Sequence, residues 1–183
     1  MKFKKLIGVL LILLSVISRA ESDNAANSEI LSSYALGSGD TIRIAVYKEP
    51  DLSIETKLTD AGTIIFPFLG EISVSGLTVG QLKEKITQGL AGRYLVDPKV
   101  TVSVLTYREF FVNGEVKKPG AYPYIPGLTA QKAISMAGGF SDRASQSNVL
   151  IIREQDPSQK PIQAEVDANV SPGDVVIVEE SFF

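Results

Sequence analysis

The chain has 183 residues, of which 44% are hydrophobic and 21% are charged, and it contains no histidine and no cysteine. This is the composition of a folded globular protein. It excludes disulfides, thiol chemistry and histidine-based acid–base catalysis. The formal net charge is −3, and without the four basic residues among residues 1–20 it is −7, from 14 basic and 21 acidic residues. Nucleic acid is therefore an unlikely partner, because its phosphates require a basic protein face.

Residues 1–20 have the pattern of a cleaved secretory signal peptide. "MKFKK" supplies a cationic start, Leu6–Ser18 is a run of mostly aliphatic residues, and Ser18-Arg19-Ala20 places small side chains at a signal peptidase site. A retained anchor is the alternative, but the run is shorter than the roughly 20 residues that span a bilayer core as a helix. We therefore expect a periplasmic mature protein that begins at Glu21, with a flexible leader at residues 21–33.

Residues 34–106 are predicted to form an N-terminal domain, and its first half has the pattern of a series of strands. Apolar and polar residues alternate from Ile42 to Val46, which predicts a strand with one buried face. Further strands are expected near residues 53–58 and 63–67, joined by a turn at Asp60-Ala61-Gly62. The pattern favours a β-meander.

A single helix is predicted in the same domain. Apolar residues recur at helical spacing in "VGQLKEKITQGL", and Thr78 with Gln81 predicts a capping box, in which each side chain serves an orphan backbone donor. The helix is expected to end near Gly92. Alternation in "KVTVSVL" then predicts a strand that closes the domain.

Residues 107–183 are predicted to form a second small domain. Its stretch "GEVKKPGAYPYIPGLTAQKAISMAGGF" reads as a strand, a tight turn, a second strand and a short helix, capped by Thr129 and closed by Gly138-Gly139. "SNVLIIRE" and "DVVIV" predict further strands. The sequence thus predicts an α+β fold of two small domains that meet near residues 106–108.

Two short motifs occur once in each predicted domain. "GLT" precedes both predicted helices, at residues 76–78 and 127–129. A Gly-Asp pair precedes an aliphatic strand at residues 39–40 and again at residues 173–174. These echoes indicate two related units.

The residues predict no catalytic, cofactor-binding or metal-binding site, and no cofactor. The chemistry open to this chain is a serine with a lysine, paired carboxylates, or a metal held by oxygen ligands. Asp40, Asp51 and Asp60 are the clustered acids of the first domain, but each lies in a turn, where aspartate bonds nearby backbone donors. The turn role is therefore favoured over general acid catalysis.

Two groups of side chains in the second domain are candidate contacts. Lys117-Lys118 is a candidate anion contact, although a solvated hairpin tip is favoured. Aromatic residues are candidates for stacking on sugar rings, although aromatic residues of strands more often lie in cores or interfaces. These aromatic residues are Phe110, Phe111, Tyr122 and Tyr124.

The order of these motifs resembles a known family. The stretch "YALGSGDTIRIAVYKEPDLS…TDAGTIIFPFLGEISVSGLTVGQL…DPKVTVSV" resembles the polysaccharide export domain of Wza-like polysaccharide biosynthesis/export proteins. "FFVNGEVKKPGAYPYIPGLTAQKAISMAGGFSDRASQSNVLIIR" resembles the SLBB β-grasp domain that follows it in that family. The resemblance covers about residues 34–178.

The resemblance implies a non-enzymatic periplasmic component of capsular or exopolysaccharide export. Such a protein forms a homo-oligomeric ring, a conduit for the polysaccharide between the inner and outer membranes, beside an inner-membrane polysaccharide co-polymerase. The lipidated cysteine, the further β-grasp domain and the C-terminal membrane-crossing helix of Wza have no counterpart here. A separate outer-membrane β-barrel protein is therefore expected to receive the polymer, so that association with the outer membrane runs through partners.

Two other functions stay open at the level of sequence. One is a soluble periplasmic β-grasp protein that binds a small ligand or a glycan fragment as a monomer. The other is an enzyme that acts on polysaccharide, which requires two carboxylates roughly 5–9.5 Å apart across a cleft.

Overall fold

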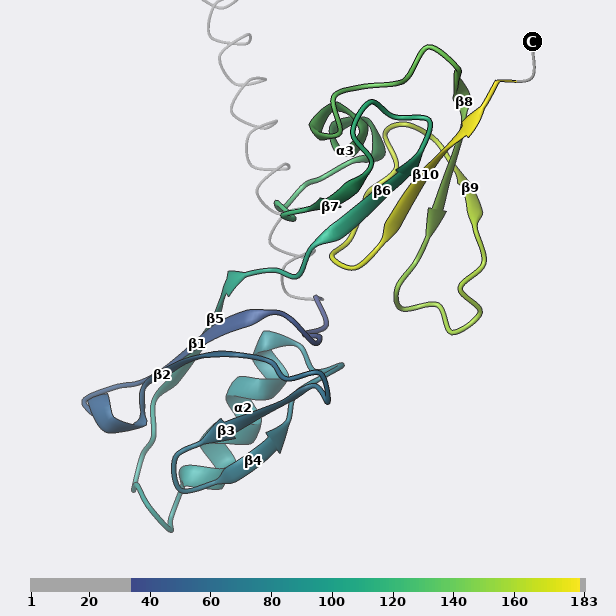
Figure 1. Cartoon of the computed structure of the whole chain (residues 1–183). Helices are drawn as coiled ribbons and strands as arrows, with labels where there is room; N and C mark the ends of the chain where they lie inside the picture. Colours follow the sequence, from purple (N-terminus) through teal and green to yellow (C-terminus); the bar gives the residue numbers. More distant parts are fainter. Residues whose placement is uncertain (1–33, 182–183) are drawn as a thin grey trace, which may run out of the picture. The chain divides into compact units, whose positions relative to one another are not determined.

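The computed structural model describes residues 34–181, and the predicted signal peptide and leader lie outside the described residues (Figure 1). From Ala35 onward the chain forms one compact unit, which contains two small domains that each combine strands with an α-helix. The predicted α+β fold is confirmed. Within residues 34–181, neither α-helix has the length and apolar composition that crossing a bilayer requires.

The first domain is built from β1 (Thr41–Val46), the 3-10 helix η1 (Pro50–Leu52), β2 (Ile54–Lys57), β3 (Thr63–Phe66), β4 (Gly70–Ser73), α2 (Val79–Leu90) and β5 (Val100–Thr106). The second is built from β6 (Phe110–Gly114), β7 (Gly120–Tyr122), α3 (Ala130–Met136), β8 (Ala144–Ile152), β9 (Ile162–Ala164) and β10 (Val175–Glu180).

The sheet of the first domain has the strand order β2-β1-β5, and both neighbours of β1 are antiparallel to it. The predicted alternation is confirmed, because Ile42, Ile44 and Val46 are buried on one face of β1. The predicted β-meander is wrong: β3 and β4 form a separate hairpin, and the second partner of β1 is β5, which follows the helix. Alternation reports which face of a strand is buried, but it does not report which strand lies beside it.

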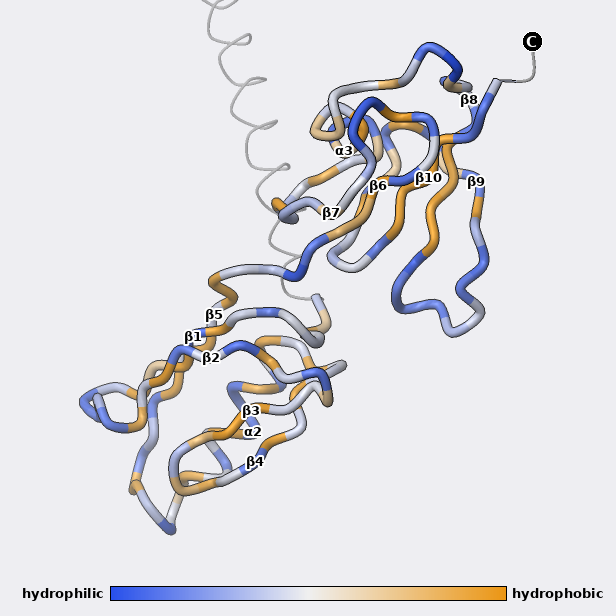
Figure 2. The backbone as a smooth tube through the Cα atoms, viewed as in Figure 1, coloured by the Kyte–Doolittle hydropathy of each residue, from blue (hydrophilic) through white to orange (hydrophobic). Residues whose placement is uncertain are grey.

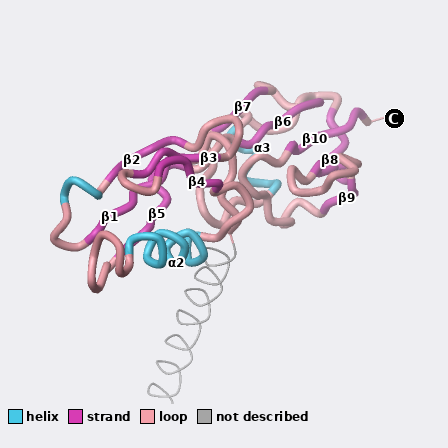
Figure 3. The backbone as a smooth tube through the Cα atoms, turned by 90° about the horizontal axis from the view of Figure 1, so that it is seen from below, coloured by secondary structure: helices cyan, strands magenta, loops and turns pink. Residues whose placement is uncertain are grey.

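Helix α2 begins and packs as its sequence predicts. The Thr78 Oγ1 accepts from the Gln81 N–H at 3.2 Å, and the Gln81 Oε1 accepts from the Thr78 N–H at 2.8 Å, which completes the capping box. Leu82, Ile86 and Leu90 form the buried face of the helix, which packs against β5 (Figure 3).

The second domain has a five-stranded sheet with the order β7-β6-β10-β8-β9, in which β6 and β10 are parallel and the other neighbours are antiparallel. Hydrophobic residues concentrate on its three central strands (Figure 2). The first strand of this domain is β6, which ends at Gly114. The prediction of a strand that begins at Gly114 is therefore wrong. Residues 117 and 118 instead donate their backbone N–H groups to the Gly139 and Ala137 carbonyls at the end of α3.

Helix α3 confirms its predicted start and stop. The Thr129 Oγ1 accepts from the Lys132 N–H at 3.4 Å, and Ala133 and Ile134 are among the buried residues of the helix. Gly138 and Gly139 follow with φ angles of 82° and 87°, in the left-handed region that favours glycine.

Gly114 and Gly139 form a matched pair for a stability test. Both have positive φ, at 81° and 87°, but a Cβ at Gly114 would collide with the Val178 carbonyl oxygen of β10, whereas a Cβ at Gly139 meets no atom within 4 Å. Gly139→Ala should therefore lower the free energy of unfolding by roughly 1–2 kcal/mol, the cost of a left-handed alanine. Gly114→Ala should lower it by about 3 kcal/mol or more, because the β6–β10 ladder must also shift.

Urea denaturation of the two variants and the wild type measures both losses. Equal losses for Gly114→Ala and Gly139→Ala would show that the close approach of β6 to β10 does not need a glycine.

Candidate functional site: the junction between the two domains

The Gly-Asp turn before β1 buries a carboxylate. Asp40 has an exposed fraction of 0%, and its Oδ2 accepts from the Gly37 N–H at 2.9 Å. The Asp40 N–H donates to the Gly37 carbonyl at 3.1 Å, and Gly39 has a φ of 91°. Asp40 therefore closes its own turn, which is the role that the sequence favoured.

The Gly-Asp turn before β10 repeats this geometry. The Asp174 Oδ2 accepts from the Ser171 N–H at 2.8 Å, the Asp174 N–H donates to the Ser171 carbonyl at 3.2 Å, and Gly173 has a φ of 84°. Asp174 has an exposed fraction of 2%. Among residues 34–181, Asp40 and Asp174 are the two buried polar or charged residues, so the sequence echo marks the two most desolvated carboxylates of the described chain.

Each buried carboxylate binds an arginine that follows the antiparallel neighbour of its strand. Arg153 follows β8, and its Nη1 donates to the Asp174 Oδ2 at 2.6 Å. Arg108 lies just after β5, and it donates from its backbone N–H to the Asp40 Oδ1 at 2.8 Å and from its Nη1 to the Asp40 Oδ2 at 3.1 Å. Both buried charges are thereby compensated.

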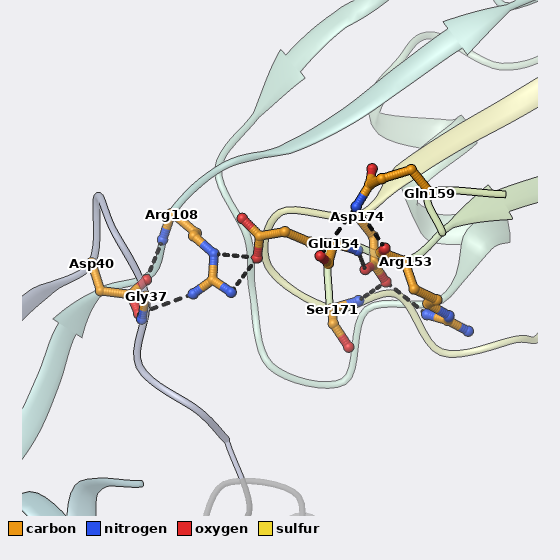
Figure 4. Close-up of polar contacts among 8 residues, drawn as sticks. All are labelled: Gly37, Asp40, Arg108, Arg153, Glu154, Gln159, Ser171 and Asp174. Carbon is orange, nitrogen blue, oxygen red and sulfur yellow. Dashed lines mark hydrogen bonds and ion pairs between the residues drawn. The ribbon is translucent and has the colours of Figure 1, made fainter. Parts of the chain in front are cut away.

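Glu154 joins the two turns (Figure 4). Its backbone N–H donates to the Asp174 Oδ1 at 3.2 Å, and its Oε2 accepts from the Arg108 Nε at 2.8 Å and also pairs with the Arg108 Nη2. We call these five residues the junction network: Asp40, Arg108, Glu154, Asp174 and Arg153. It runs without a break from the first turn of one domain to the corresponding turn of the other.

Glycines leave the space that the junction network occupies. A Cβ on Gly37 would lie 2.7 Å from the Arg108 Nη1, and a Cβ on Gly173 would collide with the Glu154 carboxylate. Side chains at these two positions would therefore displace the groups that join the domains.

Two tyrosines pack beside the network. The rings of Tyr107, in the linker after β5, and Tyr124, after β7, meet edge to face with centroids 5.3 Å apart. Burial raises the pKa of Tyr107 above its ordinary value of 10.0, and the charge of Asp40 adds to the rise. Burial also raises the pKa of Tyr124, helped by Tyr107 and Asp174 and opposed by a hydrogen bond from the Gly127 backbone.

A pocket of about 530 Å³ lies over the network. Hydroxyl groups, charged groups and the rings of Tyr107 and Phe111 share its lining, a mixture that suits a small polar ligand. These come from Thr41, Lys57, Thr106, Tyr107, Glu109 and Phe111, beside Arg108 and Glu154 of the network.

The three clustered aspartates of the first domain, Asp40, Asp51 and Asp60, are not brought together as a catalytic or metal-binding group. Asp40 is held in the junction network, whereas Asp51 lies in η1 and Asp60 lies in the turn before β3, both exposed. Within the described part of the chain, no three acidic side chains are placed to hold a metal ion.

Of the candidate contacts of the second domain, Phe110, Tyr122 and Tyr124 lie in or against its core, and the other three are exposed. Lys117 and Lys118 are exposed, and the Lys118 carbonyl accepts from the Tyr122 Oη at 2.5 Å. Phe110 is buried with its ring centroid 6.0 Å from that of Tyr122, and Tyr122 and Tyr124 pack against the hydrophobic core. Phe111 is 42% exposed and lines the junction pocket.

Sequence reasoning missed Arg108, Arg153 and Glu154. A signal was present, because an Arg-Glu pair follows an aliphatic strand in each domain, in "VLTYRE" and in "VLIIRE". Read together with the repeated Gly-Asp pair, this echo would have indicated which charges meet.

Two family models match successive parts of the chain. The family model described as "Polysaccharide biosynthesis/export protein" matches residues 28–105. The model described as "SLBB domain" matches residues 110–162. The two matches fall on either side of the junction.

Three relatives carry names that refer to polysaccharides. "EPS I polysaccharide export outer membrane protein EpsA" of Ralstonia nicotianae is 28% identical, over 88% of this chain and 52% of its own length. "Exopolysaccharide production protein ExoF" of Rhizobium meliloti is 40% identical, over 44% of this chain and 20% of its own. "Polysialic acid transport protein KpsD" of Escherichia coli is 24% identical, over 72% of this chain and 24% of its own. The matched region thus spans about half the length of EpsA, and a smaller share of the lengths of ExoF and KpsD.

The junction tyrosines predict a loss of stability in alkaline solution. A tyrosine with a raised pKa in the folded state keeps its proton longer there than in the unfolded chain. The contribution of this protonated tyrosine to the free energy of unfolding is fully present below pH 10, and it is lost as pH rises through the raised pKa of the folded state. Urea denaturation between about pH 9 and 11.5 should show this fall, and Tyr107→Phe and Tyr124→Phe should reduce it.

Tyr47 is the control for this experiment, because its side chain is 66% exposed. Tyr47→Phe should leave the alkaline fall unchanged. A fall that is the same in the wild type and in both junction variants would contradict the assignment to Tyr107 and Tyr124.

Proposed function

Because the chain belongs to the polysaccharide biosynthesis/export protein family, we propose that it is a component of a machine that exports exopolysaccharide or capsular polysaccharide. One observation carries the proposal: the two domains follow each other in the order of the family. The export-domain match ends within β5, and the SLBB match begins at β6.

The proteins of this family are export proteins and not enzymes. An export component acts by holding and guiding a polymer, which depends on shape and assembly and not on reactive groups. The buried carboxylates of this chain fit such a role, because the oxygens of Asp40 and Asp174 accept hydrogen bonds from turn amides and from arginines.

In this proposal the protein works in the periplasm as a homo-oligomeric ring, which passes the polymer between the inner and outer membranes. Its partners are the polysaccharide itself, an inner-membrane polysaccharide co-polymerase, and a separate outer-membrane protein through which it associates with that membrane. The signal-peptide pattern of residues 1–20 supports export from the cytoplasm. Similarity to EpsA, which is named an outer membrane protein, supports association with the outer membrane.

The junction pocket favours a second candidate function. A soluble monomer that binds a small ligand or a glycan fragment would use a polar and aromatic pocket between domains, which is a common place for ligand sites. The two functions differ in assembly, since a conduit requires several copies and a ligand-binding protein does not.

The mass of the protein in solution separates the two. The chain from Glu21 onward, purified from the periplasm, should have a mass by multi-angle light scattering that is a multiple of the monomer mass. Disruption of the gene in its host should abolish surface polysaccharide, and the wild-type gene should restore it. A monomer together with unchanged surface polysaccharide would favour the ligand-binding function.

Two conservative variants test whether any chemical step is involved. Asp51→Asn and Asp60→Asn remove exposed carboxylates without changing shape, and each should leave polysaccharide output and oligomer mass at the wild-type level. Loss of output in a variant that still folds and assembles would support the enzyme interpretation instead.

A further inference from the structure

We infer that Arg108 is a positioning residue that couples the two domains mechanically: its guanidinium, held between Asp40 and Glu154, makes them move as one body. This inference does not depend on the proposed function. It concerns how the chain behaves as a single subunit.

The repeated turn provides the first argument. In the second domain, Arg153 and Asp174 join β8 to β10, which are neighbours in one sheet, so that copy of the motif closes within its domain. In the first domain, Arg108 binds Asp40 in the same way beside the neighbouring strands β1 and β5, but Arg108 also has a second partner. That partner is Glu154, which adjoins Arg153 of the other motif.

The guanidinium geometry provides the second argument. Arg108 uses Nη1 for Asp40, and it uses Nε and Nη2 together for the Glu154 Oε2. A planar fork of donors can grip two carboxylates in fixed directions, whereas a lysine ammonium is a point charge without such an orientation. The side chains of Arg108 and Asp40 are 11% and 0% exposed, so water competes weakly for the bond between them, whereas the Glu154 side chain is 42% exposed.

The linker itself provides the third argument. Three residues separate β5 from β6, and each is engaged. Tyr107 packs on Tyr124, Arg108 binds Asp40 and Glu154, and the Glu109 carbonyl accepts from the Gly173 N–H at 2.9 Å. A segment that is bonded to both domains through backbone and side chains differs from a flexible linker, whose backbone is solvated.

The absence of cysteine makes the inference directly measurable. Lys83→Cys on α2 and Gln131→Cys on α3 place one spin label on an exposed position of each domain. Electron paramagnetic resonance on the chain from Glu21 onward, diluted with unlabelled chain, gives the distribution of distances between the labels. We expect a single narrow peak, which Glu154→Ala broadens or splits, because that change removes the bond between Arg108 and Glu154 and keeps Asp40 paired with Arg108.

Arg108→Lys is the second variant, since it keeps the charge and loses the fork, and it should broaden the distribution as well. The matched control is Glu55→Ala, which removes an exposed Arg–Glu pair of the first domain formed with Arg43. It should leave the peak unchanged. A distribution as narrow in Glu154→Ala as in the wild type, a wild type that is already broad, or equal broadening in Glu55→Ala would overturn the inference.

Discussion

The pairing of a buried carboxylate with an arginine at the start of a strand is the interaction on which the described structure depends. Asp40 and Asp174 lose their hydrogen bonds to water on folding. Turn amides and one guanidinium replace these bonds at each carboxylate. Because the arginine comes from the end of the neighbouring antiparallel strand, the same charge pair closes the turn and fixes where the strand begins. Removing the arginine would leave a buried carboxylate without its compensating charge.

The sequence echoes have a physical cause, because the repeated motifs contact each other in the same way in both domains. Leu36 lies four residues before Asp40, and its N–H donates to the carbonyl of Leu77, in the first "GLT", at 2.8 Å. Val170 lies four residues before Asp174, and its N–H donates to the carbonyl of Leu128, in the second "GLT", at 2.9 Å. In each domain, the segment before the Gly-Asp turn is therefore hydrogen-bonded to the segment before the helix.

Local signals were predictable from sequence, and long-range pairing was not. The capping box at Thr78 and the glycine stop after α3 depend on neighbours in sequence, so they could be read directly. The partner of β1 and the arginine of Asp40 could not, because periodicity carries no information on what lies across a sheet or 68 residues away. The site shows the same division, since the role of Asp40 within its own turn was predicted and the junction network was not.

A conduit built from identical copies places a requirement on each subunit. A ring closes only when every copy presents its two contact surfaces at the same angle, and a small angular error accumulates around the ring. A free hinge between two domains would make that angle variable, whereas a guanidinium held by two carboxylates removes the freedom within a three-residue linker. In the proposed export function, the charged residues of this chain therefore act through geometry, because the carboxylates on either side of Arg108 hold the two domains in a fixed relation.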